Sequence, residues 1–111
     1  MSLLTSINLA NNSLQAAQVG LQVTGQNIAN ADTPGYHTKD IDFRSEFENA
    51  VTGDAPTVIE PAGLSVKADG NNVNLDREAR LLSENAMRFA IASNFARSEL
   101  ASIKAAIQDG K

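Results

Sequence analysis

The two ends of this 111-residue chain each carry apolar residues that recur at a spacing of seven. In the N-terminal part, one such series is Ile7, Leu14, Leu21 and Ile28. A second series of smaller residues, three positions further on, is Ala10, Ala17, Thr24 and Ala31. This repeat is typical of a helix that packs lengthwise against another helix, and small residues let that neighbour come close. The pattern predicts a helix over residues 3–31 that needs a partner.

A second long helix is predicted over residues 75–108. One series with a spacing of seven is Leu75, Leu82, Phe89, Ala96 and Ile103. Another, offset by four, is Ala79, Ala86, Ser93, Leu100 and Ile107. Asn74 is a suitable N-cap and Gly110 an ordinary stop signal. We therefore expect the two helices to pair as an antiparallel or coiled-coil-like hairpin.

Charge divides the chain into three segments. Residues 1–36 contain one acid, Asp32, and no Lys or Arg; residues 37–73 carry three basic and seven acidic side chains; residues 74–111 carry six basic and five acidic ones. The middle holds two runs that can form short strands, Thr57–Ile59 and Leu64–Val66. About 35 residues without strong periodicity usually mean function or disorder. The expected fold is all-α, with an irregular, partly β and flexible middle segment that acts as a partner-dependent acidic connector.

Composition argues against most enzymatic and metal-binding functions. Cysteine is absent and His37 is the only histidine, so disulfides and thiolate chemistry are excluded and a histidine metal site is improbable. An acidic cluster follows His37, but no glycine sits where a calcium loop needs one; its members are Asp40, Asp42, Glu46 and Glu48. There is no phosphate-binding loop and no Ser/His/Asp set. We expect no catalysis, no cofactor and no metal.

Polarity limits the partners. A net charge of −4 argues against nucleic-acid binding. The first 31 residues carry no charge, yet fourteen of them are Ser, Thr, Asn or Gln, which is too polar for a membrane span. The N-terminus also lacks the basic and continuous apolar regions of a cleavable signal peptide. We infer that other protein chains cover the uncharged flanks of the first helix.

The densest local signal is Asn27-Ile-Ala-Asn-Ala-Asp-Thr-Pro-Gly-Tyr36. Pro34 and Gly35 fit the central positions of a type II turn, and a residue before proline is pushed out of the helical region. The first helix is therefore predicted to end near Asp32. Chemistry alone leaves open whether Tyr36 simply packs back on that helix.

The stretch from Leu14 to Tyr36 resembles the N-terminal motif of bacterial flagellar rod, hook and hook-associated axial proteins. The motif residues are Asn27, Asn30, Asp32, Thr33, Pro34, Gly35 and Tyr36. Asp69–Ala79 and Ser83–Phe89 are similar to the C-terminal region of proximal rod members of this family, and Lys39–Phe43 agrees with them. The similarity covers the chain except for residues 49–68.

This resemblance implies a structural subunit of the basal-body rod, required for flagellum assembly and motility, that self-assembles through paired terminal helices. The residues expected to mediate that pairing are Ile7, Leu14, Leu21, Ile28, Leu75, Leu82, Phe89, Leu100, Ile103 and Ile107. It also implies flagellar type III export and a location in the periplasm-spanning rod. The implied partners are copies of itself, other rod proteins and the ring or adapter protein at the rod base.

Two other hypotheses remain open from the sequence. One is another rod subunit, either the second proximal component or a distal one. The other is a small non-flagellar helical adaptor that binds a soluble partner through its acidic loop.

Overall fold

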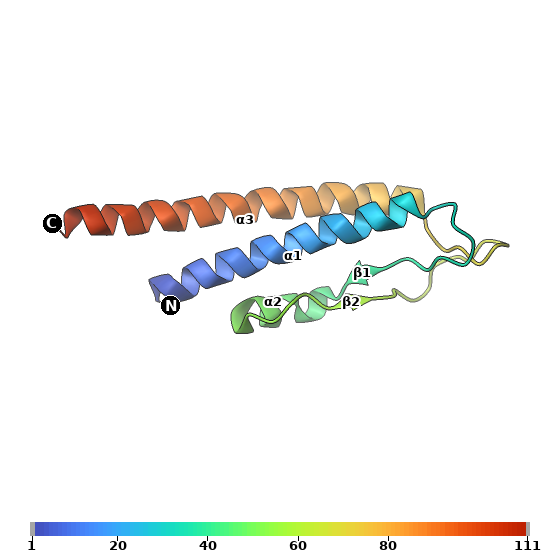
Figure 1. Ribbon diagram of the computed structural model, residues 1–111, viewed down its shortest axis with the longest axis horizontal. Helices are drawn as coiled ribbons and strands as arrows, with labels where there is room; N and C mark the ends of the chain where they lie inside the picture. The colour runs from blue at the N-terminus through green and yellow to red at the C-terminus, as the bar shows by residue number, and fades with distance from the viewer. Residues whose placement is uncertain (1, 111) are drawn as a thin grey trace.

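The computed structural model describes residues 2–110, apart from the side chains of residues 43, 44 and 47. Its elements are α1 (Leu3–Ala29), β1 (Asp40–Ile41), α2 (Phe43–Thr52), β2 (Val58–Ile59) and α3 (Leu75–Asp109). Figure 1 shows α1 and α3 running antiparallel, so that both chain ends lie at one end of the molecule. The result is an elongated body of 67 × 22 × 16 Å. The predicted helical hairpin with a partly β middle is confirmed.

The helix ends follow local capping chemistry. The Asn74 side chain accepts a hydrogen bond from the Arg77 amide at 3.1 Å, as predicted for an N-cap, and Gly110 is the C-cap of α3. Helix α1 ends at Ala29, slightly before the predicted end near Asp32. The reason is a tighter turn there, because the Thr33 amide donates to the Asn30 carbonyl three residues earlier.

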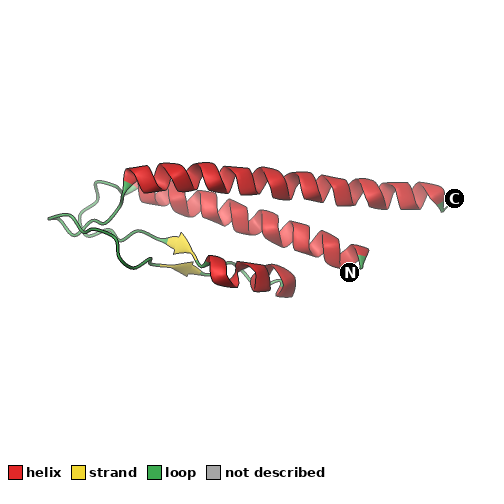
Figure 2. Cartoon of the chain, turned by 180° about the vertical axis from the view of Figure 1, so that it is seen from behind, coloured by secondary structure: helices red, strands yellow, loops and turns green. Residues whose placement is uncertain are grey.

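The middle segment contains a helix that the sequence reading missed. Helix α2 has ten residues, too few for a spacing of seven to recur. It lies along α1 (Figure 2), where Ala50 is buried and the Asn12 side-chain amide donates to the Ala50 carbonyl at 2.7 Å. Strands β1 and β2 pair antiparallel, with Asp40 opposite Ile59. β2 falls in the predicted run at residues 57–59, whereas residues 64–66 form no strand.

The contact face of α1 is its series of small residues. Ala10, Ala17, Thr24 and Ala31 are all buried, with exposed fractions between 1% and 8%. α3 comes close to α1 at Gly20: a Cβ added there would lie 2.7 Å from Asn85 Oδ1, nearer than folded proteins allow. The predicted close approach of a second helix to this series is therefore present within one chain.

The contact face of α3 differs from the predicted one. Its buried residues are Glu78, Asn85 and Ala92, which also recur at a spacing of seven. This series lies three residues after Leu75, Leu82 and Phe89, whereas the sequence reading placed the second series four residues after them. Ala79 and Ala86 of that predicted series are exposed in the single chain. Two members of this series are polar, so apolar spacing does not reveal it. Each hydrogen-bonds to α1: Glu78 Oε2 accepts from Asn27 at 3.0 Å and Asn85 Nδ2 donates to Thr24 Oγ1 at 3.4 Å, while Asn85 Oδ1 has no partner among the described residues.

Candidate assembly interface

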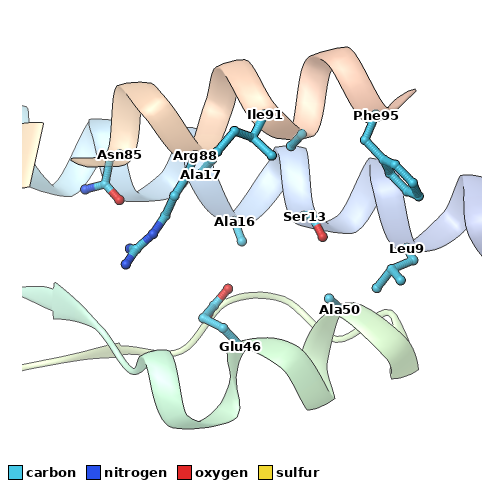
Figure 3. A pocket seen from close by; sticks show the side chains of 11 residues that line it. Leu9, Ser13, Ala16, Ala17, Glu46, Ala50, Asn85, Arg88, Ile91 and Phe95 are labelled. Carbon is cyan, nitrogen blue, oxygen red and sulfur yellow. The ribbon is translucent and has the colours of Figure 1, made fainter. Parts of the chain in front are cut away.

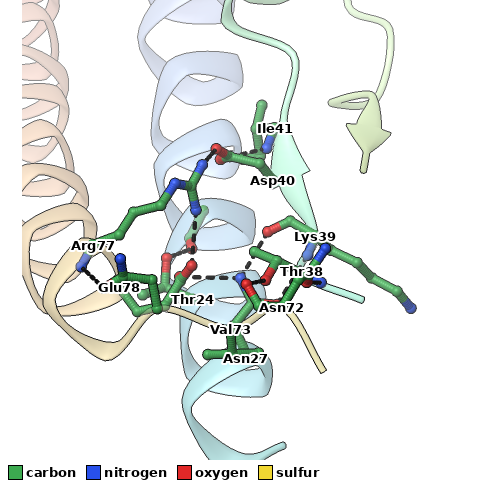
Figure 4. A network of polar contacts seen from close by, with 12 residues as sticks. Thr24, Asn27, Thr38, Lys39, Asp40, Ile41, Asn72, Val73, Arg77 and Glu78 are labelled. Carbon is green, nitrogen blue, oxygen red and sulfur yellow. Dashed lines mark hydrogen bonds and ion pairs between the residues drawn. The ribbon is translucent and has the colours of Figure 1, made fainter. Parts of the chain in front are cut away.

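One amide side chain holds together the tip of the hairpin, where the turn after α1 meets the loop before α3. Asn27 is 1% exposed, and its Nδ2 donates to the Lys39 carbonyl at 2.7 Å and to Glu78 Oε2 at 3.0 Å. Its Oδ1 accepts from the Tyr36 hydroxyl at 2.9 Å and from the Lys39 amide at 3.0 Å. Figure 4 shows this polar network, with Asn27, Lys39 and Glu78 labelled. Both donors and both acceptor sites of this amide are used, which fixes its position.

A buried carboxylate joins this network to α3. The Glu78 side chain is completely buried, and its Oε1 accepts from Arg77 Nη1 at 2.8 Å. Arg77 also contacts Asp40 Oδ2 through Nη2 at 2.5 Å. A carboxylate without such partners would be expensive to bury. Asn27, Arg77 and Asp40 therefore tie α1, α3 and β1 together at one level of the hairpin.

Tyr36 returns to α1, which settles the alternative that the sequence left open. The Tyr36 amide donates to the Thr33 carbonyl at 3.2 Å and Gly35 has a φ of +75°, as the predicted type II turn requires. Burial, and secondly the negative charge of Glu78, raise the pKa of Tyr36. The hydroxyl therefore keeps its proton and serves as the donor to Asn27.

The C-terminal end of α1 is capped by a residue of the loop that precedes α3. Asn71 is completely buried, and its Nδ2 donates to the carbonyls of Asn30 at 2.9 Å and Thr33 at 2.8 Å. Both carbonyls lie just after α1 and each also accepts a backbone amide, from Thr33 and from Tyr36, so Asn71 uses their second acceptor sites. The Gly35 amide donates to the Asp69 carbonyl at 2.9 Å, so the turn after α1 and the loop before α3 interlock.

The remaining motif residues lie on the surface of this tip. Asp32, Thr33 and Pro34 are exposed, and the Thr33 hydroxyl donates to Asn30 Oδ1 at 3.1 Å. The Asn30 amide turns back to the Gln26 carbonyl at 2.8 Å. The motif thus divides into buried closing residues and an exposed rim.

Sequence reasoning missed several residues that close the tip. Thr38 is completely buried, with its amide donating to Asn72 Oδ1 at 2.6 Å and its hydroxyl to the Asn72 carbonyl at 3.1 Å. Asn71 and Glu78 were missed as well. The available signal was the run of asparagines just before α3, since buried asparagines in loops commonly satisfy backbone groups.

Many of the predicted pairing residues are not buried within one chain. Ile7, Leu14, Leu21 and Ile103 are half-buried. The others are exposed by 37% to 62%: Ile28, Leu75, Leu82, Phe89, Leu100 and Ile107. Contiguous exposed apolar side chains mark interaction surfaces. Their role in pairing with other subunits stays a prediction.

An open apolar groove lies where α1, α2 and α3 meet. It has a volume of about 580 Å³ and is lined by Leu9, Ala16, Ala17, Ala50, Ile91 and Phe95 among others. Figure 3 shows Glu46 of α2 pointing into it. The Glu46 Oε1 atom is buried and lacks a hydrogen-bond partner among the described residues. Burial, and then the nearby Asp42, raise the pKa of Glu46, while Arg88 opposes the shift.

Comparison with known proteins identifies the family. Residues 7–37 match the family described as flagella basal body rod protein. The flagellar basal body rod protein FlgB of Proteus mirabilis is 30% identical over an alignment of 115 positions, and the match covers 80% of this chain and 83% of that protein. The chain belongs to the flagellar basal body rod protein family. FlgB of Salmonella typhimurium is 28% identical over an alignment of 114 positions, and the match covers 80% of this chain and 83% of that protein. FlgB of Borrelia hermsii is 25% identical over an alignment of 115 positions, and the match covers 80% of this chain and 85% of that protein.

Family membership assigns a structural role in the basal body. The stretch matched to the rod-protein family contains Asn27, Asn30 and Tyr36, so it includes the α1 side of the closed tip. This rod protein is a structural subunit of the flagellar basal body, and the adaptor hypothesis is not favoured.

Two further observations concern membranes and metals. Along residues 2–110, no helix of this rod protein combines the length and the apolar composition that crossing a bilayer would require. Within the same residues, no three His, Asp or Glu side chains gather as a metal site would need. Asp40 is bound by Arg77, Glu46 faces the groove, and Glu48 is exposed. His37 is exposed, with its Nδ1 3.6 Å from Glu60 Oε2.

Proposed function

We propose that this rod protein is a proximal rod subunit that self-assembles side by side through the faces of α1 and α3 that remain exposed in one chain. The carrying observation is the exposed apolar row on α3, which includes Leu75, Leu82 and Phe89. A single hairpin of two helices buries one stripe of each helix and leaves such a row uncovered. Neighbouring subunits would bury it.

The closed tip supports this role by fixing the hairpin before assembly. Because Asn27 and Glu78 hydrogen-bond across α1 and α3, the two helices cannot slide relative to each other without breaking a buried contact. The exposed rows of both helices therefore keep one relative position. A subunit that repeats in a polymer needs such a constant surface.

The three segments would have separate tasks. In this proposal residues 1–36 and 74–111 form the assembling hairpin, and residues 37–73 contact neighbours. Those neighbours would be other rod proteins and the ring or adapter protein at the rod base, with delivery by the flagellar export apparatus. The family and the acidic middle segment support this placement.

Replacement of Leu82 by Glu tests the role of the exposed row. Leu82 is 41% exposed, so the single chain should keep its circular dichroism spectrum and its thermal unfolding. The variant should nevertheless fail to restore swimming to a strain that lacks this protein, and should be depleted from isolated basal bodies. Ser83→Glu, one residue away and also exposed, is the matched control and should support motility. Normal swimming with Leu82→Glu would contradict the proposal.

A further inference from the structure

The groove holds a carboxylate among apolar side chains, and the C-terminal end of α3 holds a cation among exposed apolar side chains. α3 has 35 residues and α1 has 27, so the last turns of α3 extend past the start of α1 (Figure 1). From Arg97 to Gly110 no residue is buried. Leu100 and Ile107 are 59% and 62% exposed. This end of the helix therefore has apolar side chains without an intramolecular partner.

One cation sits within that apolar face. Leu100, Lys104 and Ile107 are four and three positions apart, so they lie on the same side of α3. Lys104 has no ion pair within the described residues. The groove holds the opposite charge: the Glu46 carboxylate lies among apolar residues, and its Oε1 lacks a donor among the described residues. Arg88 also lines the groove and lowers the pKa of Glu46, but Glu46 Oε1 still lacks a donor among the described residues, and a lysine between two aliphatic side chains can supply one.

We propose that the groove between α1, α2 and α3 receives the C-terminal end of α3 from a second copy of the chain, with Lys104 of that copy donating to Glu46. This inference rests on the proposed self-assembly and names the contact that carries it. The N-terminal turns of α1 also expose Leu3 and Leu4. They are the poorer occupant, because residues 1–36 contain no Lys or Arg to meet Glu46.

The contact determines how successive copies are displaced. Copies related by helical symmetry point the same way, and Arg88 of the receiving chain lies in the groove near Glu46. Placing Lys104 at the level of Arg88 shifts the second copy by sixteen positions along α3, about 24 Å at the rise of an α-helix. The two contact surfaces differ, so the contact is head-to-tail and leaves a free site at each end. It therefore extends a polymer instead of closing a dimer.

Charge reversal tests the pair in the full-length chain. Sedimentation velocity across a concentration series should show that Glu46→Lys and Lys104→Glu each raise the half-association concentration about tenfold, and that the double variant restores it to within about threefold. Glu48→Lys is the matched control, because Glu48 lies on the same helix and is exposed outside the groove. If Glu46→Lys loses helicity, Glu46→Gln with Lys104→Met provides the same cycle without reversed charges.

Cross-linking identifies the occupant, since the chain contains no cysteine of its own. Mixing Ala16→Cys with Leu100→Cys under oxidising conditions should give a disulfide-linked heterodimer. A heterodimer with Leu4→Cys in place of Leu100→Cys would assign the groove to α1 of the neighbour and overturn the proposal. If the wild-type chain associates and both charge-reversal variants have the same half-association concentration as the wild type, the groove contact alone is overturned. Absence of any wild-type association would overturn the proposed self-assembly as well.

Discussion

Gly20 and Gly25 provide a direct test of the close approach of α1 and α3. Both lie inside α1, and replacement of glycine by alanine in a helix gains about 1 kcal/mol of helix propensity at either position. Their surroundings differ. A Cβ at Gly25 meets nothing within 4 Å, whereas a Cβ at Gly20 would lie 2.7 Å from Asn85 Oδ1 and 2.9 Å from Asn85 Cγ.

The expected magnitudes follow from that difference. Gly25→Ala should stabilise the chain by up to about 1 kcal/mol. Gly20→Ala gains the same propensity but overpacks a buried contact, which costs about 1–3 kcal/mol. The gain in helix propensity is the same in both variants, so it cancels when their free energies of unfolding are subtracted. The remaining difference is the cost of overpacking at Gly20. We therefore expect Gly20→Ala to be less stable than Gly25→Ala by about 1–3 kcal/mol.

Urea unfolding followed by circular dichroism measures both free energies, at a concentration where sedimentation shows only monomer. A second measurement isolates the cause. Asn85→Ala should lower the free energy of unfolding less in the Gly20→Ala background than in the wild type, because it removes the group that the new methyl meets. Gly20→Ala as stable as Gly25→Ala would refute the close contact at Asn85 and the helix register based on it.

Two further predictions concern the polar tip and α2. Asn27→Ala removes an amide that makes four hydrogen bonds and leaves buried groups without partners, so the free energy of unfolding should fall by about 2 kcal/mol or more. Asn30→Ala, which removes an amide that hydrogen-bonds at the surface, should lower it clearly less. Equal losses in the two variants would contradict the role of Asn27. The pKa of Glu46 is raised, so the folded chain binds the proton more tightly than the unfolded chain, and this carboxyl's contribution to stability should fall as pH rises from its ordinary pKa through the raised one. Hydrogen exchange of α2 should then be slower below that range than above it, and Glu46→Gln should remove the difference; an unchanged pH dependence in Glu46→Gln would assign it to another group.

The sequence predicted those parts of the fold that depend on local pattern. The spacing of Ala10, Ala17 and Thr24 indicates a contact face because all three are small, and Pro34 followed by Gly35 specifies a turn by backbone geometry alone. Capping by Asn74 is also local. Each of these signals lies within a few residues of the structure it determines, so one sequence is enough to find it.

The rest depends on contacts between distant residues. The α3 contact series begins with Glu78 and Asn85, and polar residues are placed in a contact face only when their partners are known. Those partners, Asn27 and Thr24, lie 51 and 61 positions away. Asn71 likewise caps a helix that ended long before it in the chain. Patterns of apolar spacing carry no information about such hydrogen bonds.

The interlocked tip also determines where the chain can accept insertions. The Tyr36 carbonyl accepts from the Asn72 amide at 3.3 Å, and the Thr38 amide donates to Asn72 at 2.6 Å, so the chain leaves the hairpin and returns to it at one fixed point. Any segment inserted between these residues starts and ends side by side. Doubling the length of such a loop costs only about 0.6 kcal/mol of closure entropy. The Asp42 amide likewise donates to the Thr57 carbonyl at 2.9 Å, so an insertion between residues 42 and 57 would also start and end close together and leave the helical hairpin unchanged.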